Sequence, residues 1–152
     1  MTRFDEIDQL LKQADAFIAG GQSAEMIAAA QARLGVTFSA SFRAYLLKWG
    51  NLSFNGYKYY GLTRNADFDH ASIPNCVWFT LRKRVQVGLP ESLVVFRSEN
   101  DEEYYCLETA QTRDDECPVV IWDNIAREIS QTLNLSFIDY LREELGEWLD
   151  EM

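Results

Sequence analysis

The chain has 152 residues, of which 47% are hydrophobic and 25% are charged, a composition typical of a globular domain. A chain of this length buries about 68–70% of its unfolded surface without help from disulfides or metals, so we expect one domain over residues 1–152. The formal net charge of -10 disfavours binding to nucleic acid or to anionic membranes and favours a basic partner.

Membrane insertion and export are disfavoured by the placement of apolar and acidic residues. The longest apolar stretches, residues 26–30 and 117–122, are far shorter than the ~20 residues of a membrane span. Acidic residues at positions 5, 6 and 8 occupy the region where a secretory signal has basic and then apolar residues, so we expect a cytoplasmic protein. Cys76, Cys106 and Cys117 form no CxxC element and cannot all pair, which indicates reduced and mostly buried thiols.

The acidic residues are concentrated in the last third of the chain. Residues 1–98 carry 11 basic and 8 acidic side chains, a net charge of +3, whereas residues 99–152 carry 3 basic and 16 acidic ones, a net charge of -13. Such an acidic segment is most often a solvated face that aids solubility, so charge alone does not identify a binding surface.

Apolar residues at three- and four-residue spacing predict three helices in the first third of the chain. The first is expected over residues 4–18, ending at a pair of glycines. The second runs from an N-cap at Ser23 to a C-cap at Gly35. The third begins at Ser39 or Ser41 and closes at Gly50.

The pattern then changes to the two-residue period of strands. Residues 54–62 are expected to form a hairpin or bent strand, interrupted by the turn signal at 55–56. A fourth helix is predicted over 72–85, with Pro74 in its first turn. The apolar face expected for this helix consists of Val77, Trp78, Leu81 and Val85.

The last part of the chain mixes strands with one helix. Short strands are predicted at residues 93–96, 104–107 and 118–122, and the connection between the first two suggests an antiparallel pair. A final helix is expected over 136–149, capped by Ser136. Because helices and strands do not alternate regularly, the order of elements indicates an α+β fold.

His70, the only histidine, is the residue on which acid–base or metal chemistry would depend. It follows Asp67 and Asp69, but zinc sites need three or four ligands and no second histidine or cysteine pair completes one. The glycines form no phosphate-binding loop. We therefore expect no metal, no cofactor and no enzyme. An enzyme built on Asp69 and His70 is a minor alternative, and the sequence leaves open a carboxylate pair of the glycosidase type.

A series of segments occurs in a distinctive order along the chain. A helix ending in Leu34-Gly35 precedes a segment with an aromatic-x-x-x-Leu pattern and an Asn/Gly turn, residues 42–51, and then Gly61-Leu62. Later come Asp69-His70-Ala71-Ser72, Ser92 to Phe96, Tyr104 to Glu108, and Glu116-Cys117-Pro118-Val119-Val120-Ile121-Trp122-Asp123. This series resembles the Smi/Knr or SUKH superfamily over nearly the whole chain. The later segments are similar to the YobK-type bacterial members.

One position departs from the pattern of that superfamily. The family usually has Leu-Pro before its third helix, and this chain has Phe38-Ser39. Because a serine cap can replace a first-turn proline, we expect an altered helix start and not a different fold.

The resemblance implies both a fold and a function. The fold is α+β, a central, mostly antiparallel sheet flanked by helices. For bacterial members, the implied function is that of an immunity protein, which binds and neutralises a polymorphic toxin, commonly a nuclease, in the cytoplasm. The acidity of this chain agrees with that expectation, because a nuclease cleft that holds a polyanion is basic. We expect a cognate toxin with a basic surface as partner, and neither nucleic acid nor membrane.

The candidate contact residues are chosen for charge and expected exposure, since the family motif does not supply them. Successive residues of a strand point to opposite faces, so either Tyr104 or Tyr105 is expected to be exposed as an aromatic anchor. The full set is Glu99, Asp101, Glu102, Glu103, Tyr104, Tyr105, Asp114, Asp115 and Glu116. The alternative function is that of a noncatalytic adaptor or regulatory module, because other superfamily members act as scaffolds.

Overall fold

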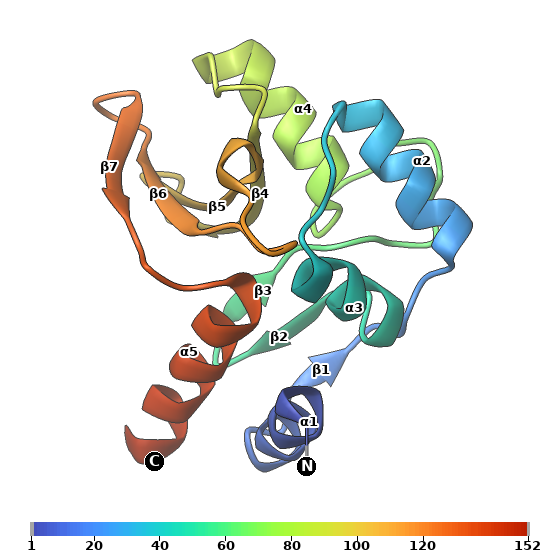
Figure 1. The fold of residues 1–152 in the computed structure, drawn as a ribbon, viewed down its shortest axis with the longest axis vertical. Coiled ribbons are helices and arrows are strands. Elements are labelled where there is room, and N and C mark those ends of the chain that lie inside the picture. Colours follow the sequence, from blue (N-terminus) through green and yellow to red (C-terminus); the bar gives the residue numbers. More distant parts are fainter. Residues whose placement is uncertain (1, 152) are drawn as a thin grey trace.

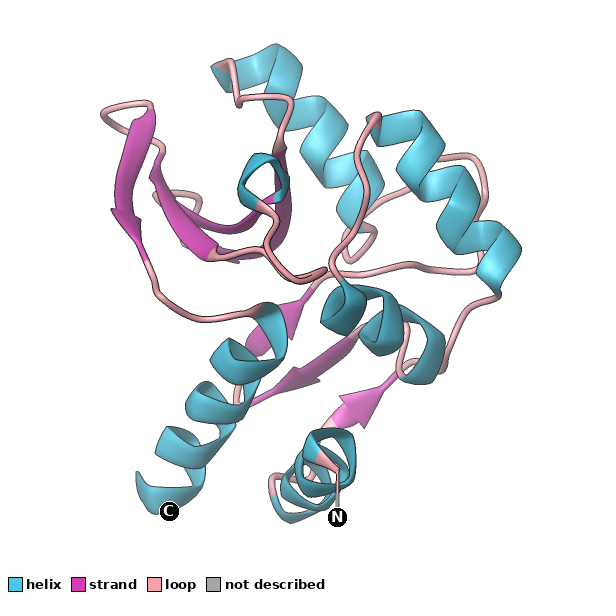
Figure 2. Ribbon diagram, in the orientation of Figure 1, coloured by secondary structure: helices cyan, strands magenta, loops and turns pink. Residues whose placement is uncertain are grey.

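In the computed structural model, which describes residues 2–151, the chain forms two antiparallel sheets and five α-helices (Figures 1 and 2). The α+β prediction is confirmed. The elements, in chain order, are α1 (Arg3–Gln13), β1 (Phe17–Ile18), α2 (Ala24–Leu34), α3 (Ala40–Lys48), β2 (Leu52–Phe54), β3 (Tyr57–Tyr59), α4 (Cys76–Val87), β4 (Leu93–Glu99), β5 (Glu103–Glu108), the short 3-10 helix η1 (Thr109–Gln111), β6 (Val119–Asp123), β7 (Glu128–Thr132) and α5 (Phe137–Glu151).

The second helix has both caps that the sequence predicts, and the third has a predicted N-cap but ends at a C-cap of Trp49, one residue before the predicted Gly50. The Ser23 side chain accepts a hydrogen bond from the Met26 N–H at the start of α2, and Gly35 ends that helix in the left-handed region, with φ of 72°. Ser39 rather than Ser41 is the N-cap of α3. These caps satisfy backbone groups that have no partner inside the helix, so both helix starts are set locally.

The first helix is shorter than predicted. It ends at Gln13, and Asp15 then takes a left-handed φ of 54°. Phe17 and Ile18 leave the helix to pair with β2, opposite Ser53 and Leu52. The expectation of helix up to Ile18 is therefore wrong. The helical spacing of apolar residues continues through Ile18, but Phe17 and Ile18 form backbone hydrogen bonds with the distant strand β2 instead.

The first sheet has the order β1-β2-β3 and contains the predicted hairpin. Asn55 and Gly56 both have positive φ, 50° and 77°, at the two central positions of the turn. Turns with positive φ at both central residues match the twist of paired strands, which is why Asn-Gly is a strong hairpin signal.

The fourth helix, α4, starts later than predicted and has a different buried face. Its N-cap is Asn75, whose side chain accepts from the N–H groups of the next turn, so Pro74 precedes the helix. Val85, expected in the core, is 87% exposed. Thr80 is buried instead, and its Oγ1 accepts a hydrogen bond from the Val95 N–H of β4. A buried threonine held by a strand breaks the hydropathy pattern on which the prediction relied.

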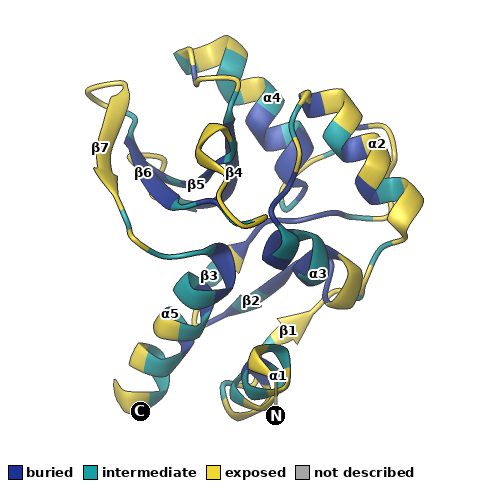
Figure 3. Ribbon diagram, in the orientation of Figure 1, coloured by how far each residue is buried: buried dark blue, intermediate teal, exposed yellow. Residues whose placement is uncertain are grey.

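The second sheet has the order β4-β5-β6-β7, with every neighbouring pair antiparallel. The first three strands and α5 confirm the prediction. Strand β7 was missed, because all five of its residues are exposed and no apolar alternation marks it. Figure 3 shows β7 as an exposed strand beside the buried β6.

The core joins the two sheets through α5. The Phe137 ring, at the start of α5, lies 4.9 Å from Phe42 of α3, 6.2 Å from Tyr59 of β3 and 5.1 Å from Phe96 of β4, centroid to centroid. Helix α4 packs against β4 on its other side (Figure 1). The second sheet is therefore held from both sides at β4, whereas β7 extends away from the core.

Candidate functional site: an acidic edge of the second sheet

One end of the second sheet collects acidic residues from all four strands. Antiparallel pairing brings the ends of β4 and β6 together with the starts of β5 and β7. Glu99 lies opposite Glu103, Glu103 opposite Asp123, and Asp123 opposite Glu128. Directly opposite residues share a face of the sheet, with Cβ atoms about 4.5–5.5 Å apart. We call these four residues the acidic row.

The turn between β4 and β5 adds two exposed carboxylates to this edge. Asp101 Oδ1 lies 3.5 Å from Lys83 Nζ of α4 and accepts a hydrogen bond from the Tyr104 hydroxyl. Glu102 has no side-chain hydrogen bond or ion pair within residues 2–151. The edge therefore contains one carboxylate engaged by a lysine and one fully available to a partner.

A buried arginine pairs with Glu99, the residue at the β4 end of the acidic row. The Arg97 side chain is only 5% exposed, and its Nη2 lies 2.6 Å from Glu99 Oε2. Its guanidinium carbon lies 4.7 Å from the ring centroids of both Tyr57 and Tyr105. A planar cation between two aromatic faces is favourable, so Arg97 holds Glu99 in place from below.

Arg97 also pairs with Glu144 of α5, at 3.4 Å between Nε and Oε1. The Glu144 carboxylate accepts hydrogen bonds from the hydroxyls of Tyr59, at 2.5 Å, and Tyr140, at 3.2 Å. Burial raises the pKa of Glu144, and Arg97 opposes that rise. Burial lowers the pKa of Arg97, but the carboxylates, Glu144 first, more than reverse this and raise it. This network joins α5 to both sheets beneath the acidic row.

The predicted contact residues do not form one surface. Asp114, Asp115 and Glu116 lie in the connection from β5 to β6, at the end of these strands opposite the acidic row. Glu116 accepts hydrogen bonds from the Ser41 N–H and hydroxyl, at 3.0 and 2.7 Å. Asp115 Oδ2 lies 2.7 Å from Arg43 Nη2. Glu116 and Asp115 therefore fasten this connection to the start of α3.

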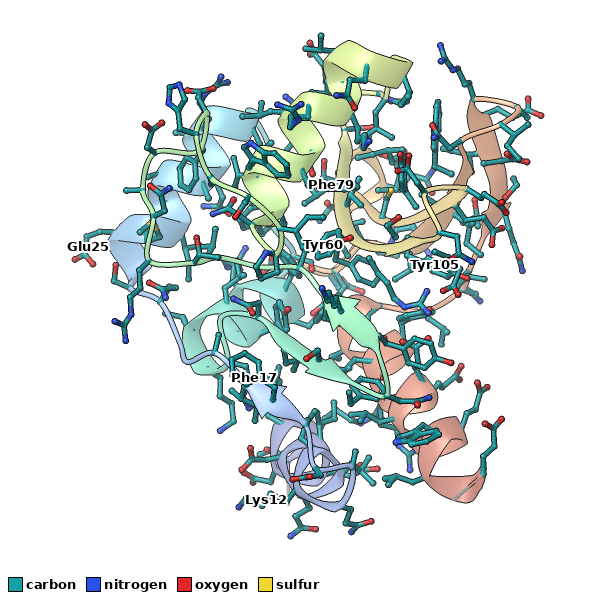
Figure 4. The ribbon with its side chains drawn as sticks, turned by 180° about the vertical axis from the view of Figure 1, so that it is seen from behind. Lys12, Phe17, Glu25, Tyr60, Phe79 and Tyr105 are labelled. Carbon is teal, nitrogen blue, oxygen red and sulfur yellow. The ribbon has the colours of Figure 1, made fainter. Side chains whose placement is uncertain are left out.

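The expectation that Tyr104 or Tyr105 is exposed is wrong. Tyr104 is completely buried, and its ring meets Phe79 of α4 edge-on at 5.5 Å. Tyr105, on the opposite face, is partly buried against Arg97 and against Tyr140, 5.6 Å away (Figure 4). Both faces of β5 are covered here, one by α4 and the other by α5, which strand alternation alone could not show.

Two residues of the acidic row, Asp123 and Glu128, were absent from the prediction. Asp123 ends the apolar strand β6, and Glu128 begins β7, the strand without a hydropathy signal. The only sequence signal was the -13 charge of residues 99–152, which does not identify individual residues.

His70 does not form the pair on which the enzyme alternative was built. Its Nδ1 lies 2.9 Å from Asp67 Oδ2, whereas Asp69 pairs with Arg33 at 2.8 Å. The hydrogen bond from His70 lowers the pKa of Asp67. Within residues 2–151, no group of three or more His, Cys, Asp or Glu side chains is placed to hold a metal ion. The same residues contain no helix with the length and apolar character needed to cross a membrane.

Comparison with known proteins places the chain in a family. Residues 5–149 match SUKH_5, described as SMI1-KNR4 cell-wall. The fold is similar to the crystal structure of a protein from Pseudomonas syringae pv. tomato, with a TM-score of 0.68 and 16% sequence identity. That match covers 91% of this chain and 96% of the other, and at this identity it speaks for the fold alone. Since the family match spans nearly all of its residues, this chain belongs to the SMI1-KNR4 (SUKH) family.

Proposed function

We propose that this protein is a noncatalytic, YobK-like immunity protein that binds a cognate toxin domain with a basic surface and neutralises it in the cytoplasm. Its contact surface is the acidic row together with Glu102. Membership of the family agrees with this proposal, and the observation that carries it is the row of four carboxylates in register across the second sheet.

The acidic row is costly in the free protein. Like charges directly opposite each other in a sheet are destabilising, and opposite-charge pairs at such positions contribute about 0.2–1 kcal/mol each. The row contains three successive like-charge pairings, and Arg97 offsets the one that involves Glu99. Lysine or arginine side chains of a partner remove this repulsion, so the unfavourable energy of the free state becomes part of the binding energy.

The carboxylates of the row that have no ion pair within the described residues include those on β5 and β7. Arg97 pairs with Glu99, but Glu103 and Glu128 have no ion pair within the described residues. Complementary charge raises association rates to about 10⁸–10⁹ M⁻¹s⁻¹ at low salt. Fast association suits a protein that must bind a toxin before the toxin acts, and a nuclease cleft, built for a polyanion, is basic.

The proposal is tested by coexpression with the toxin domain encoded by the neighbouring gene, scoring growth and copurification. Charge reversal by Glu102→Lys with Glu103→Lys is expected to weaken the complex at least tenfold, to reduce its salt dependence and to abolish rescue. The matched control is Glu143→Lys with Glu147→Lys on α5, which changes net charge equally on residues outside the acidic row.

Two results would contradict this proposal. Equal rescue, affinity and salt dependence for both double variants would show that the acidic edge is not the contact surface. Failure of the unaltered chain to rescue growth, with several housekeeping proteins recovered instead of a toxin, would favour the adaptor function.

A further inference from the structure

We propose that the basic partner docks by adding an extended strand to the open edge of β7, with a lysine or arginine placed across from Glu128. This inference rests on the proposed function, because it says how the partner of the acidic row binds. It adds to the charged contact surface a specific backbone pairing between the partner and β7.

Among the residues that the structure describes, β7 is the one outer strand of the second sheet with an open edge. The other outer strand, β4, is met by the chain after β3, where the Tyr60 N–H donates to the Phe96 carbonyl at 2.7 Å. Within residues 2–151, β7 pairs only with β6, and all five of its residues are exposed. Figures 1 and 3 show it standing clear of the helices.

The backbone of β7 presents hydrogen-bonding groups outward. The Leu133 N–H donates to the Val119 carbonyl of β6, at 2.8 Å. Because hydrogen-bonded and non-hydrogen-bonded pairs alternate along antiparallel strands, the N–H and carbonyl of Thr132 point away from β6. Edge strands are commonly protected by lysine, proline or a covering element. Strand β7 has no lysine or proline. A register shift between Ile121 and Trp122 interrupts its pairing but leaves Gln131 opposite Ile121 and Thr132 opposite Val120.

The side chains at this edge define the added strand. The acidic row ends at Glu128, so the next position in the row belongs to the added strand, where a basic residue faces a carboxylate. On the opposite face, Ile129 is 39% exposed and lies across from Trp122. A strand that alternates basic and apolar residues therefore complements both faces.

A second copy of this chain is a poorer occupant. Each copy carries a formal net charge of -10, so two copies repel each other. Charge complementarity favours a basic strand from a different protein.

The test uses a capped synthetic peptide of about ten residues, within the usual length of a strand, that alternates lysine and valine. One control peptide has glutamate in place of lysine, and another has an N-methyl group on every residue, which removes the backbone donors of both edges without altering the protein. Affinity is measured by titration calorimetry, and amide exchange reports on the backbone of β7.

The lysine peptide is expected to bind and to slow exchange of the Thr132 amide at least tenfold. Both control peptides are expected to bind the unaltered chain at least tenfold more weakly than the lysine peptide does. The lysine peptide is likewise expected to bind the Glu128→Lys and Thr132→Pro variants at least tenfold more weakly than it binds the unaltered chain. A proline at an edge position removes an outward donor and leaves the ladder to β6 intact. The Glu143→Lys variant is expected to bind like the unaltered chain.

Three results would overturn the inference: no binding or no protection of β7 amides by the lysine peptide; equal binding of the N-methylated peptide; or protection of Thr132 by self-association without peptide. The N-methylated peptide keeps the test decisive even if Thr132→Pro fails to fold. If the coexpressed toxin is neutralised while these peptides leave β7 unprotected, strand addition fails and the proposed function stands. If the toxin forms no complex, the proposed function itself fails.

Discussion

Replacing Arg97 by methionine tests how much the ion pair between Arg97 and Glu144 of α5 contributes to the free energy of unfolding. Methionine retains an unbranched apolar stem but leaves the Glu144 carboxylate, whose side chain is 15% exposed, without its cation. Removing one partner of a buried ion pair costs about 3–5 kcal/mol, because the other charge stays buried and uncompensated. Near pH 8 we expect the free energy of unfolding to fall by about this amount, a large part of the total stability of an ordinary domain.

The loss is expected to depend on pH, with a sign set by Glu144. Burial raises the folded-state pKa of this residue above its usual 4.5, so the folded chain binds more protons than the unfolded chain between the two values. The contribution of Glu144 to stability is therefore greatest at low pH and falls as pH rises toward the folded-state pKa. Without Arg97 the folded-state pKa of Glu144 rises further, and each unit of that rise corresponds to about 1.4 kcal/mol. The loss of stability caused by Arg97→Met is therefore expected to be smaller at pH 5 than at pH 8.

Urea denaturation followed by tryptophan fluorescence, at about pH 5 and pH 8, measures both effects. The control is the double variant Arg97→Met with Glu144→Gln, which removes the buried charge together with its partner. It is expected to regain about 1–3 kcal/mol at pH 8 relative to the single variant, the usual size of coupling between contacting residues. A loss below about 1 kcal/mol at pH 8, or an equal loss at both pH values, would refute the reasoning.

Two further predictions concern backbone space and thiol burial. Gly61→Ala is expected to prevent folding, because a Cβ would lie 1.8 Å from the Gly50 carbonyl oxygen. The Cβ of Gly35→Ala would meet no atom within 4 Å, so this variant is expected to lose only about 1–2 kcal/mol of stability for its left-handed φ. Thermal melting measures both effects. A stable Gly61→Ala protein would contradict the first part. Burial raises the pKa of Cys76 to about 12, so iodoacetamide is expected to leave this thiol unmodified near pH 8 until denaturant is added, as mass spectrometry can show. Rapid labelling of the folded chain at this cysteine would be the contrary result.

The elements that the sequence predicted correctly are those with local signals. Helices α2 and α3 have serine caps three residues before the N–H groups they accept from, and Asn55-Gly56 has the backbone freedom that its hairpin turn needs. Ser136 likewise accepts from the Asp139 N–H at the start of α5. These interactions span two to four residues, so they can be recognised from residue order alone.

The candidate site depended on residues that are far apart in the chain. Total charge predicted an acidic surface, but it could not separate Glu103, in the row, from Glu116, which is engaged with α3 at the other end of the sheet. The network of Arg97 and Glu144 joins residues from β4 and α5, and neither side chain has a sequence pattern that identifies its partner.

What the amino-acid sequence determined by itself was the set of local elements, the α+β class and the excess of negative charge. The tertiary structure alone decided that β7 exists, that Tyr104 is buried and that four carboxylates form one row. The physical reason is that strand register is set by backbone pairing and core packing between distant segments. A shift of one residue in that pairing would have moved each of these carboxylates to the opposite face of the sheet.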